Sequence, residues 1–236
     1  MAIGIAPLLA LGATGCQSTQ DKAAALSQEG SQAFKREGLH VSRPNPSVRI
    51  ISTTAVQDPN GTAVAVRLKN MSGKRMVKVP IAINVRDKAG KKLFANDAPG
   101  LDDSLVGIAF LRPKEEVTWV NDQVVAPATP GNVTAVAGVE AKKLAADEPR
   151  ITLQQIKQRE DSAGINVTGF VMNKSGVEQR NLVIYAVATR SGKVVAAGRG
   201  LVARVKPGKR ARFTTYFIGD PTGAKLDLAV PATTLG

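Results

Sequence analysis

The side chains that carry most enzyme chemistry are scarce in this sequence of 236 residues, which contains one cysteine, Cys16, and one histidine, His40. A single cysteine excludes an internal disulfide and a cysteine-rich zinc site. A single histidine excludes a metal centre built from clustered histidines, and we expect His40 to be solvated. These counts remove the catalytic chemistries that depend on several thiols or imidazoles.

Carboxylates occur mainly as neighbouring pairs. Neighbouring residues of a strand point to opposite faces of a sheet, so such a pair cannot flank one substrate, and we expect solvated acids in loops. Asp97, Asp102 and Asp103 form an alternative Ca²⁺ site made of oxygen ligands, although no known loop spacing supports it. The pairs are Asp102-Asp103, Glu115-Glu116, Asp147-Glu148 and Glu160-Asp161.

Motifs that activate a nucleophile or hold a nucleotide are also missing. The sequence has no Gly-x-Ser-x-Gly elbow, and the region expected to fold offers no histidine to act as a base. It has no Gly-x-x-x-x-Gly-Lys-Ser/Thr phosphate loop. A Ser–Lys dyad and an unrecognised hydrolase are alternatives that no motif supports. We therefore expect no catalytic residue, no metal and no cofactor.

The distribution of charge is the most unusual property of the chain. It has 32 Lys and Arg against 19 Asp and Glu, a net charge of +13, and residues 149–236 hold 14 basic and 5 acidic side chains. Aromatic residues make up only 4%, which is lean for stacking on bases, so we do not expect nucleic acid as a partner. Paired strands around the turn at Pro207-Gly208 are predicted to form a surface that attracts polyanions, with ordinary solubility as the alternative explanation. The predicted anion-binding residues are Arg204, Lys206, Lys209, Arg210 and Arg212.

Cys16 is expected to be lipidated rather than catalytic. The apolar run from Ile3 to Ala13 has 11 residues, which is too short to cross a bilayer but suits a secretory signal. Ala13-Thr14-Gly15-Cys16 resembles a bacterial lipobox, although Ala13 stands where leucine is usual and no basic residue precedes the run. We predict a lipoprotein signal peptide at 1–15 and an acylated Cys16 that anchors the chain to a membrane outside the cytoplasm. The alternative is a buried helix with Cys16 as a core thiol.

After the predicted signal the chain reads as a tether followed by two related halves. Residues 16–45 are rich in Gln, Ser, Ala, Gly and Lys, a composition typical of a flexible spacer. At an offset of 103, Asn70, Ser72 and Gly73 match Asn173, Ser175 and Gly176; at an offset of 94, Leu111-Arg112-Pro113 matches Val205-Lys206-Pro207. The first copy holds about eight extra residues around 96–104. We interpret this pattern as an internal duplication.

Each half alternates between apolar and polar residues with the period of a strand. In 64–69 the pattern places Ala65 in water, and in 201–206 it places Leu201 toward a core and Val202 outward. Turn segments such as Asn70-Met71-Ser72-Gly73 supply residues that tolerate a positive φ. The sequence therefore predicts an all-β protein with two tandem immunoglobulin-like antiparallel β-sandwiches, at 46–144 and 149–236, after the signal and tether segments.

A family resemblance accompanies this pattern. The run from Ile83 to Lys91, followed by Leu111-Arg112-Pro113, is similar to the bacterial FxLYD-type domain, with Asp87 at the Asp of that motif. Ile83 and Arg86 replace the Phe and Tyr of the motif. In the second copy, Tyr185-Ala186-Val187-Ala188-Thr189 and Val205-Lys206-Pro207-Gly208 take the same places. The resemblance implies an immunoglobulin-like sandwich on an extracytoplasmic lipoprotein, without enzyme activity or a known ligand.

Together these observations predict a non-catalytic, lipid-anchored protein of the cell envelope. It would act as a binding or scaffolding module for an anionic envelope polymer or a lipid surface. The alternative is a protein–protein interaction module of an envelope complex that binds through exposed sheet edges. The expected partners are the membrane, through acylated Cys16, and either an anionic polymer or a partner envelope protein.

Overall fold

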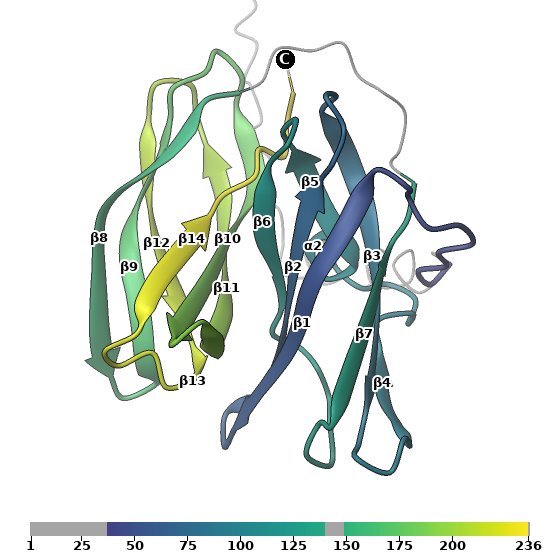
Figure 1. Cartoon of the computed structure of the whole chain (residues 1–236). Coiled ribbons are helices and arrows are strands. Elements are labelled where there is room, and N and C mark those ends of the chain that lie inside the picture. The colour runs from purple at the N-terminus through teal and green to yellow at the C-terminus, as the bar shows by residue number, and fades with distance from the viewer. Residues whose placement is uncertain (1–36, 140–148, 236) are drawn as a thin grey trace, which may run out of the picture.

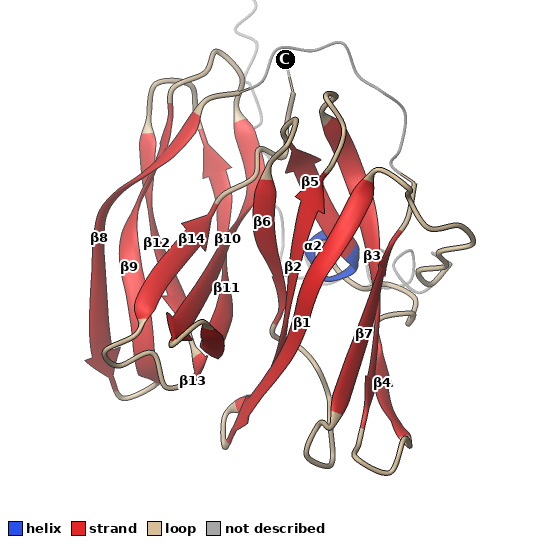
Figure 2. Ribbon diagram, in the orientation of Figure 1, coloured by secondary structure: helices blue, strands red, loops and turns tan. Residues whose placement is uncertain are grey.

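The period-two alternation of the sequence produces a chain that is almost entirely strand (Figure 2). The computed structural model describes residues 37–139 and 149–235, which form antiparallel sheets packed as two sandwiches (Figure 1). The predicted all-β sandwich fold is confirmed. The predicted signal peptide, Cys16 and residues 17–36 of the tether lie outside the described residues.

The elements divide evenly between the two halves. The first sandwich contains β1 (Val48–Asp58), β2 (Gly61–Asn70), β3 (Met76–Arg86), β4 (Lys92–Ala95), helix α2 (Asp103–Val106), β5 (Gly107–Leu111), β6 (Glu116–Asn121) and β7 (Asn132–Ala137). The second contains β8 (Ile151–Asp161), β9 (Gly164–Asn173), β10 (Gln179–Arg190), β11 (Lys193–Val205), β12 (Arg210–Tyr216), β13 (Ile218–Gly219) and β14 (Lys225–Ala229).

The two sandwiches have corresponding strand pairings. One sheet has the order β1-β2-β6 in the first sandwich and β8-β9-β12 in the second. In the other sheet, β3 pairs with β4, β5 and β7, whereas β10 pairs with β11 and β14. The single long strand β11 stands where the first sandwich has two short strands, β4 and β5. The extra residues of the first copy, including α2, interrupt that strand.

A buried asparagine closes the corresponding turn in each half. Nδ2 of Asn70 donates to the carbonyls of Lys74 and Arg112, and its Oδ1 accepts from Ser72. Asn173 bonds in the same way to Val177, Val205 and Ser175. Neither asparagine has a positive φ, so these turns depend on the amide side chain, whereas the sequence analysis attributed them to an unusual backbone conformation.

The last residues of the predicted tether lie against the first sandwich. The backbone N–H of Asn45 donates to the carbonyl of Ala137 at 2.8 Å, and Pro44 forms a bridge with Gly138. Asn45 is buried, and the backbone of Gly38 lies too close to Asp97 to admit a Cβ atom. His40 is exposed, as its position in the sequence predicts. The packed body therefore begins before residue 46.

The two sandwiches share a hydrophobic interface, so the sheets form four layers (Figure 1). Val183, Tyr185 and Val187, on the outer face of β10, belong to the same buried cluster as the core of the first sandwich. Ala65 is 3% exposed because it faces the second sandwich, so its predicted position in water is wrong. Strands β2 and β10 are consequently buried on both faces.

The alternation predicted for 201–206 is also wrong at its first residues. Val202 is buried and Leu201 is 54% exposed, the reverse of the prediction. Both Val202 and Val205 face the core although they are three positions apart, which a regular strand does not allow. The break lies opposite Asn181, whose φ of 49° is in the left-handed region. Lys78, at the matching place in β3, has a φ of 51°.

The close approach of β11 to β12 gives a test of this packing. A Cβ atom on Gly198 would lie 1.9 Å from the backbone oxygen of Tyr216, whereas one on Gly176 would meet nothing within 4 Å. We expect Gly198→Ala to destabilise the protein by at least about 2 kcal/mol, because backbone must move. Gly176→Ala is the control and should be near neutral. Equal midpoints for both variants in denaturant titrations would contradict this packing.

Candidate functional site

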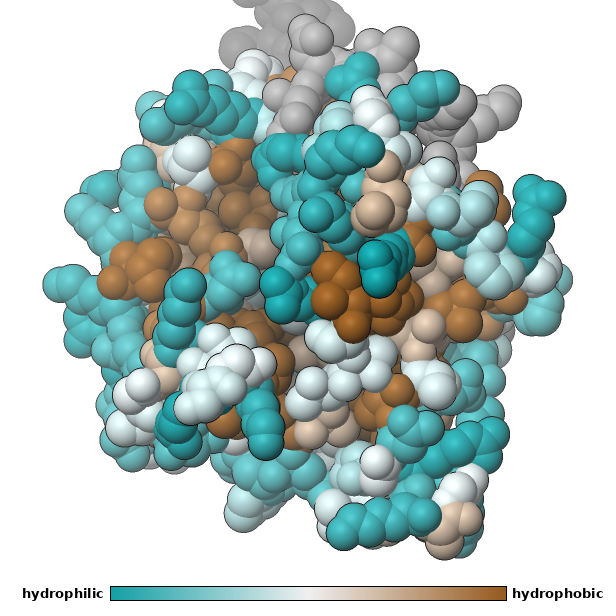
Figure 3. All heavy atoms as spheres, in the orientation of Figure 1, coloured by the Kyte–Doolittle hydropathy of each residue, from teal (hydrophilic) through white to brown (hydrophobic). Residues whose placement is uncertain are grey.

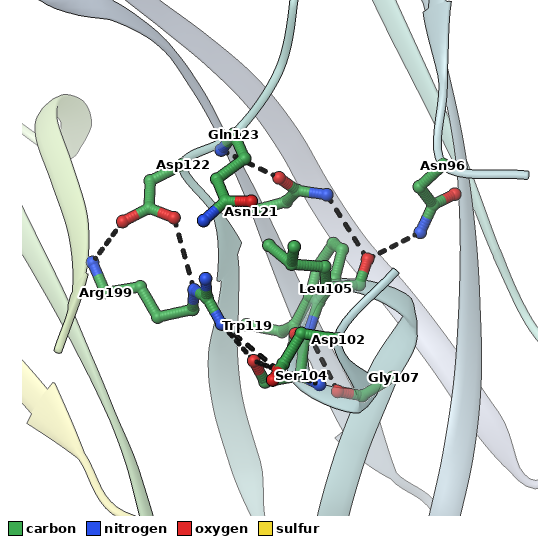
Figure 4. Close-up of polar contacts among 10 residues, drawn as sticks. All are labelled: Asn96, Asp102, Ser104, Leu105, Gly107, Trp119, Asn121, Asp122, Gln123 and Arg199. Carbon is green, nitrogen blue, oxygen red and sulfur yellow. Dashed lines mark hydrogen bonds and ion pairs between the residues drawn. The ribbon is translucent and has the colours of Figure 1, made fainter. Parts of the chain in front are cut away.

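The most elaborate polar cluster of the described residues lies between the two sandwiches (Figure 4). Arg199 of β11 reaches across to the first sandwich with a side chain that is 4% exposed. Its Nε lies 3.2 Å from Oδ1 of Asp122, and its backbone N–H donates to Oδ2 of the same residue at 3.0 Å. Its Nη1 lies 3.4 Å from Asp102 and also donates to Ser104. One guanidinium from the second sandwich thus binds two carboxylates of the first.

The extra segment of the first copy supplies part of this cluster. Asp102 caps α2 by accepting from the backbone N–H of Ser104 at 2.9 Å. Behind it, the Trp119 indole donates to the carbonyl of Ser104 at 2.8 Å, and buried Asn96 donates to the carbonyl of Leu105 at 2.9 Å. These bonds hold the segment so that Asp102 faces Arg199 (Figure 4).

Burial and the neighbouring polar groups have opposite effects on the pKa of Asp102 at this junction. Burial acts to raise the pKa of Asp102, but hydrogen bonds from Ser104 and the nearby charge of Arg199 hold it below the usual value. Burial raises the pKa of the Tyr185 phenol, so this group stays neutral. The cluster therefore serves to hold the sandwiches together, because the guanidinium of Arg199 offsets part of the negative charge of two carboxylates on the other sandwich.

A cleft of about 860 Å³ lies beside the junction, lined by residues that include Lys78, Asp103, Arg180 and Thr234. Within the described ranges, no group of three or more His, Cys, Asp or Glu side chains is placed to hold a metal ion. The three acids weighed as a Ca²⁺ site are engaged differently: Asp102 contacts Arg199, and Asp97 lies 3.4 Å from Nζ of Lys92. The geometry does not gather these acids around a cation.

The five predicted anion-binding residues do not lie on one hairpin, and that part of the prediction is wrong. Strand β11 pairs with β10, whereas β12 pairs with β9 in the opposite sheet. The turn at Pro207-Gly208 therefore connects two layers. Arg204 and Lys206 lie at one layer, and Arg210 and Arg212 lie on the outer face of the other.

Arg204 forms an ion pair with a carboxylate of its own sandwich. Its Nε lies 2.6 Å from Oε2 of Glu178, and Arg180 binds the other oxygen of that carboxylate at 2.9 Å. The hydrogen bond from Arg204 is the largest of the effects that lower the pKa of Glu178. Arg204 therefore adds less free positive charge than its neighbours do.

Four exposed cations gather where the loops of the second sandwich meet, and we call them the basic end: Arg150, Lys174, Lys206 and Lys209. The backbone N–H of Lys174 donates to the carbonyl of Arg150 at 2.8 Å. The backbone N–H of Lys209 donates to the carbonyl of Lys206 at 3.1 Å. Sequence reasoning missed Arg150 and Lys174 because they come from other loops, although the offset of 103 could have placed them there.

The first sandwich shows that this charge is not a requirement of the fold. The same backbone hydrogen bonds join Met71 to Ser47 and Glu115 to Arg112. These four positions carry no net charge in the first sandwich and +4 in the second. Lys114 of the first sandwich stands at the position of Gly208, and both residues have a positive φ. The end of the first sandwich therefore carries one cation at a position where the second sandwich has glycine.

A second group of cations, which we call the basic face, lies on the outer side of sheet β8-β9-β12: Lys157, Arg159, Arg210 and Arg212. All are exposed, and none forms an ion pair among the described residues. The guanidinium of Arg210 lies 4.5 Å from the centre of the Phe170 ring, a cation–π arrangement. The sheet lies on the side of the second sandwich away from the first (Figure 1).

The matching face of the first sandwich has a different character because it is covered. It presents Ala63, Ala65 and Val120 to the second sandwich, all of them buried. The strand pairings place Asn166, Thr168 and Thr214 at these positions on the basic face. Figure 3, in the orientation of Figure 1, has hydrophilic side chains along the edge formed by β8 and hydrophobic ones between the sandwiches. Asn166 and Thr168 are themselves buried, and the exposed positions of this face are those of Thr214 and the four cations.

Comparison with known proteins adds no family assignment. No protein-family model matches the chain, and no curated protein matches its sequence. Among the helices of the described ranges, none has the length and apolar character needed to span a membrane.

The buried junction predicts a strong effect of removing its one cation. We expect Arg199→Met to destabilise the protein by about 3 kcal/mol, because Asp122 and Asp102 would be left facing each other without a counterion. Arg204→Met is the matched control, since Arg204 lies on the same strand in an ion pair with a side chain that is 55% exposed. It should cost less than about 1 kcal/mol. Similar losses in denaturant titration of both variants would show that the junction contributes no special stability.

The lowered pKa of Asp102 predicts a dependence of stability on pH. A carboxylate whose pKa is lower in the folded state stabilises the fold above its unfolded pKa, about 3.8 for Asp, and this contribution disappears as the pH falls through the folded value. Asp102→Asn should therefore be less stable than the wild type above pH 4, by less than about 1 kcal/mol because the carboxylate is half exposed. The difference should vanish in stronger acid. Asp103→Asn, which makes no described contact with Arg199, is the control, and unfolding at several pH values is the measurement.

Proposed function

We propose that the protein is a non-catalytic, lipid-anchored binding or scaffolding module of the bacterial cell envelope, whose second sandwich attracts an anionic partner. The observation that carries this proposal is the free positive charge of the basic end and the basic face. The four corresponding positions of the first sandwich carry no net charge, and its corresponding sheet face is covered by the second sandwich. Cations without acidic neighbours attract polyanions by releasing their counterions.

The anchor belongs to the same proposal. Lipidated Cys16 and the spacer that follows would keep the two sandwiches at a membrane outside the cytoplasm. The resemblance of the first copy to the FxLYD-type domain supports an envelope location, since that family consists of extracytoplasmic domains. The corresponding strand pairings and the repeated asparagine turns support our proposal that the halves arose by duplication.

Docking of a partner protein on a sheet edge is the weaker alternative. Strand β8 is an edge strand whose residues 155–161 are all exposed, so its outer backbone groups are open to a partner strand. However, Lys157 and Arg159 lie on this edge, and charged side chains on an edge discourage the addition of another strand. The observed charges therefore favour an anionic ligand.

The proposal is tested with the full chain, because β10 would lose its apolar cover if the second sandwich were isolated. We expect salt-sensitive retention on immobilised poly(glycerol phosphate) or polyglutamate, or on vesicles that contain phosphatidylglycerol. A triple variant with changes in both groups, Lys174→Glu, Lys206→Glu and Arg212→Glu, should weaken retention at least tenfold. The control is Lys88→Glu, Lys91→Glu, Lys193→Glu, which makes the same change in net charge in other loops. Equal losses in the two variants, or no retention of the wild type on any probe, would reject the proposal.

A further inference from the structure

We infer that the basic face binds a linear phosphodiester polymer of the polyol phosphate type, laid obliquely across β12, β9 and β8. This inference rests on the proposed function and narrows the anionic partner to one chemical class. It depends on the spacing of the four cations, on the aromatic support of one of them, and on their position on one outer sheet face.

The strand registers fix the spacing. Arg210 and Arg212 are two residues apart on β12, and Lys157 and Arg159 are two residues apart on β8. Alternate residues of a strand lie on one face about 7 Å apart, and two strand spacings across the sheet add about 10 Å. The cations therefore form two pairs, each with a separation of about 7 Å, joined by an oblique step of about 12 Å across β9.

A polyol phosphate chain matches this spacing. In glycerol phosphate linked through its terminal oxygens, six bonds separate consecutive phosphorus atoms. Three bonds span about 3.8 Å in an extended chain, so six bonds span about 7 Å. Consecutive phosphates can then meet both cations of a pair at once. Three of the four cations are arginines, whose planar forks bind phosphate oxygens in a bidentate way.

The surroundings of the cations favour a polymer of phosphates over a sugar or a membrane. The Phe170 ring under Arg210 is occupied by the guanidinium, so it offers no open platform on which a sugar can stack. The cations also lie in an oblique row on the outer face of sheet β8-β9-β12, which one linear chain can follow, whereas a membrane plane would contact protruding loops such as those of the basic end. The ring limits the motion of Arg210, which reduces the entropy lost when a phosphate binds.

Asp161 marks the end of the face. Its Oδ2 accepts hydrogen bonds from the phenol of Tyr216 and the amide of Asn166, both at 3.0 Å. This carboxylate belongs to the row next to Arg159, and it would repel a further phosphate. The face therefore accommodates about five phosphates, one for each cation and one over β9 between the two pairs.

The experiment compares three probes by titration with the full chain: poly(glycerol phosphate), vesicles containing phosphatidylglycerol, and polyglutamate of equal charge. Arg212→Glu with Lys157→Glu should weaken binding to poly(glycerol phosphate) at least tenfold and binding to vesicles less than twofold. Lys88→Glu with Lys193→Glu, the control of equal charge, should change each less than twofold. Affinity for glycerol phosphate oligomers should rise with length up to about five phosphates.

A variant that keeps the net charge distinguishes a specific binding site from non-specific electrostatic attraction. Phe170→Leu removes the ring beneath Arg210 and should weaken binding to poly(glycerol phosphate) two- to threefold without altering the melting temperature by more than a few degrees. Unchanged affinity in this variant, or equal affinity for polyglutamate, would overturn the assignment of a phosphodiester polymer. If vesicles or polyglutamate bind tightly and the double variant of the face has no effect, the proposed function survives and this inference fails. If the wild type binds no probe, both fail.

Discussion

The arrangement of this protein depends on the burial of one sheet face of each sandwich against the other. Val183, Tyr185 and Val187 of β10 pack with the core of the first sandwich, and Arg199 beside them binds Asp122 and Asp102 across the junction. The apolar contact supplies the favourable free energy of burial. The ion pairs fix the position of one sandwich on the other, because moving them apart would leave buried charges without a partner and would be unfavourable. This combination fixes which faces of the sheets remain in water.

The exposure of the basic face follows from that constraint. Each sandwich has a three-stranded sheet with an outer face. In the first sandwich, small apolar residues such as Ala63 and Ala65 occupy this face and the second sandwich covers it. In the second sandwich, Asn166 and Thr168 take those positions, and four cations surround them. The first sandwich thus uses this face for the contact between the halves, and in the second the same face carries exposed positive charge.

The extra segment of the first copy has a structural explanation rather than a catalytic one. It interrupts the strand that is continuous as β11 in the second copy, and its polar residues bond inward to Trp119 and Asn96. Asp102 is thereby placed against Arg199, whereas Asp97, another of the acids weighed as a Ca²⁺ site, lies near Lys92. Asp102 is therefore part of the junction between the sandwiches.

The sequence by itself determined the all-β fold, because the alternation of apolar and polar residues with period two is a local property that only a strand can satisfy. It also identified four of the eight cations of the basic end and the basic face: Lys206, Lys209, Arg210 and Arg212. Tertiary structure alone decided that Ala65 is buried, that β11 and β12 belong to different sheets, and that Lys157 and Arg159 share a face with Arg210 and Arg212. Local periodicity records that a strand has two faces, but whether a face meets water or another sheet depends on residues more than a hundred positions away.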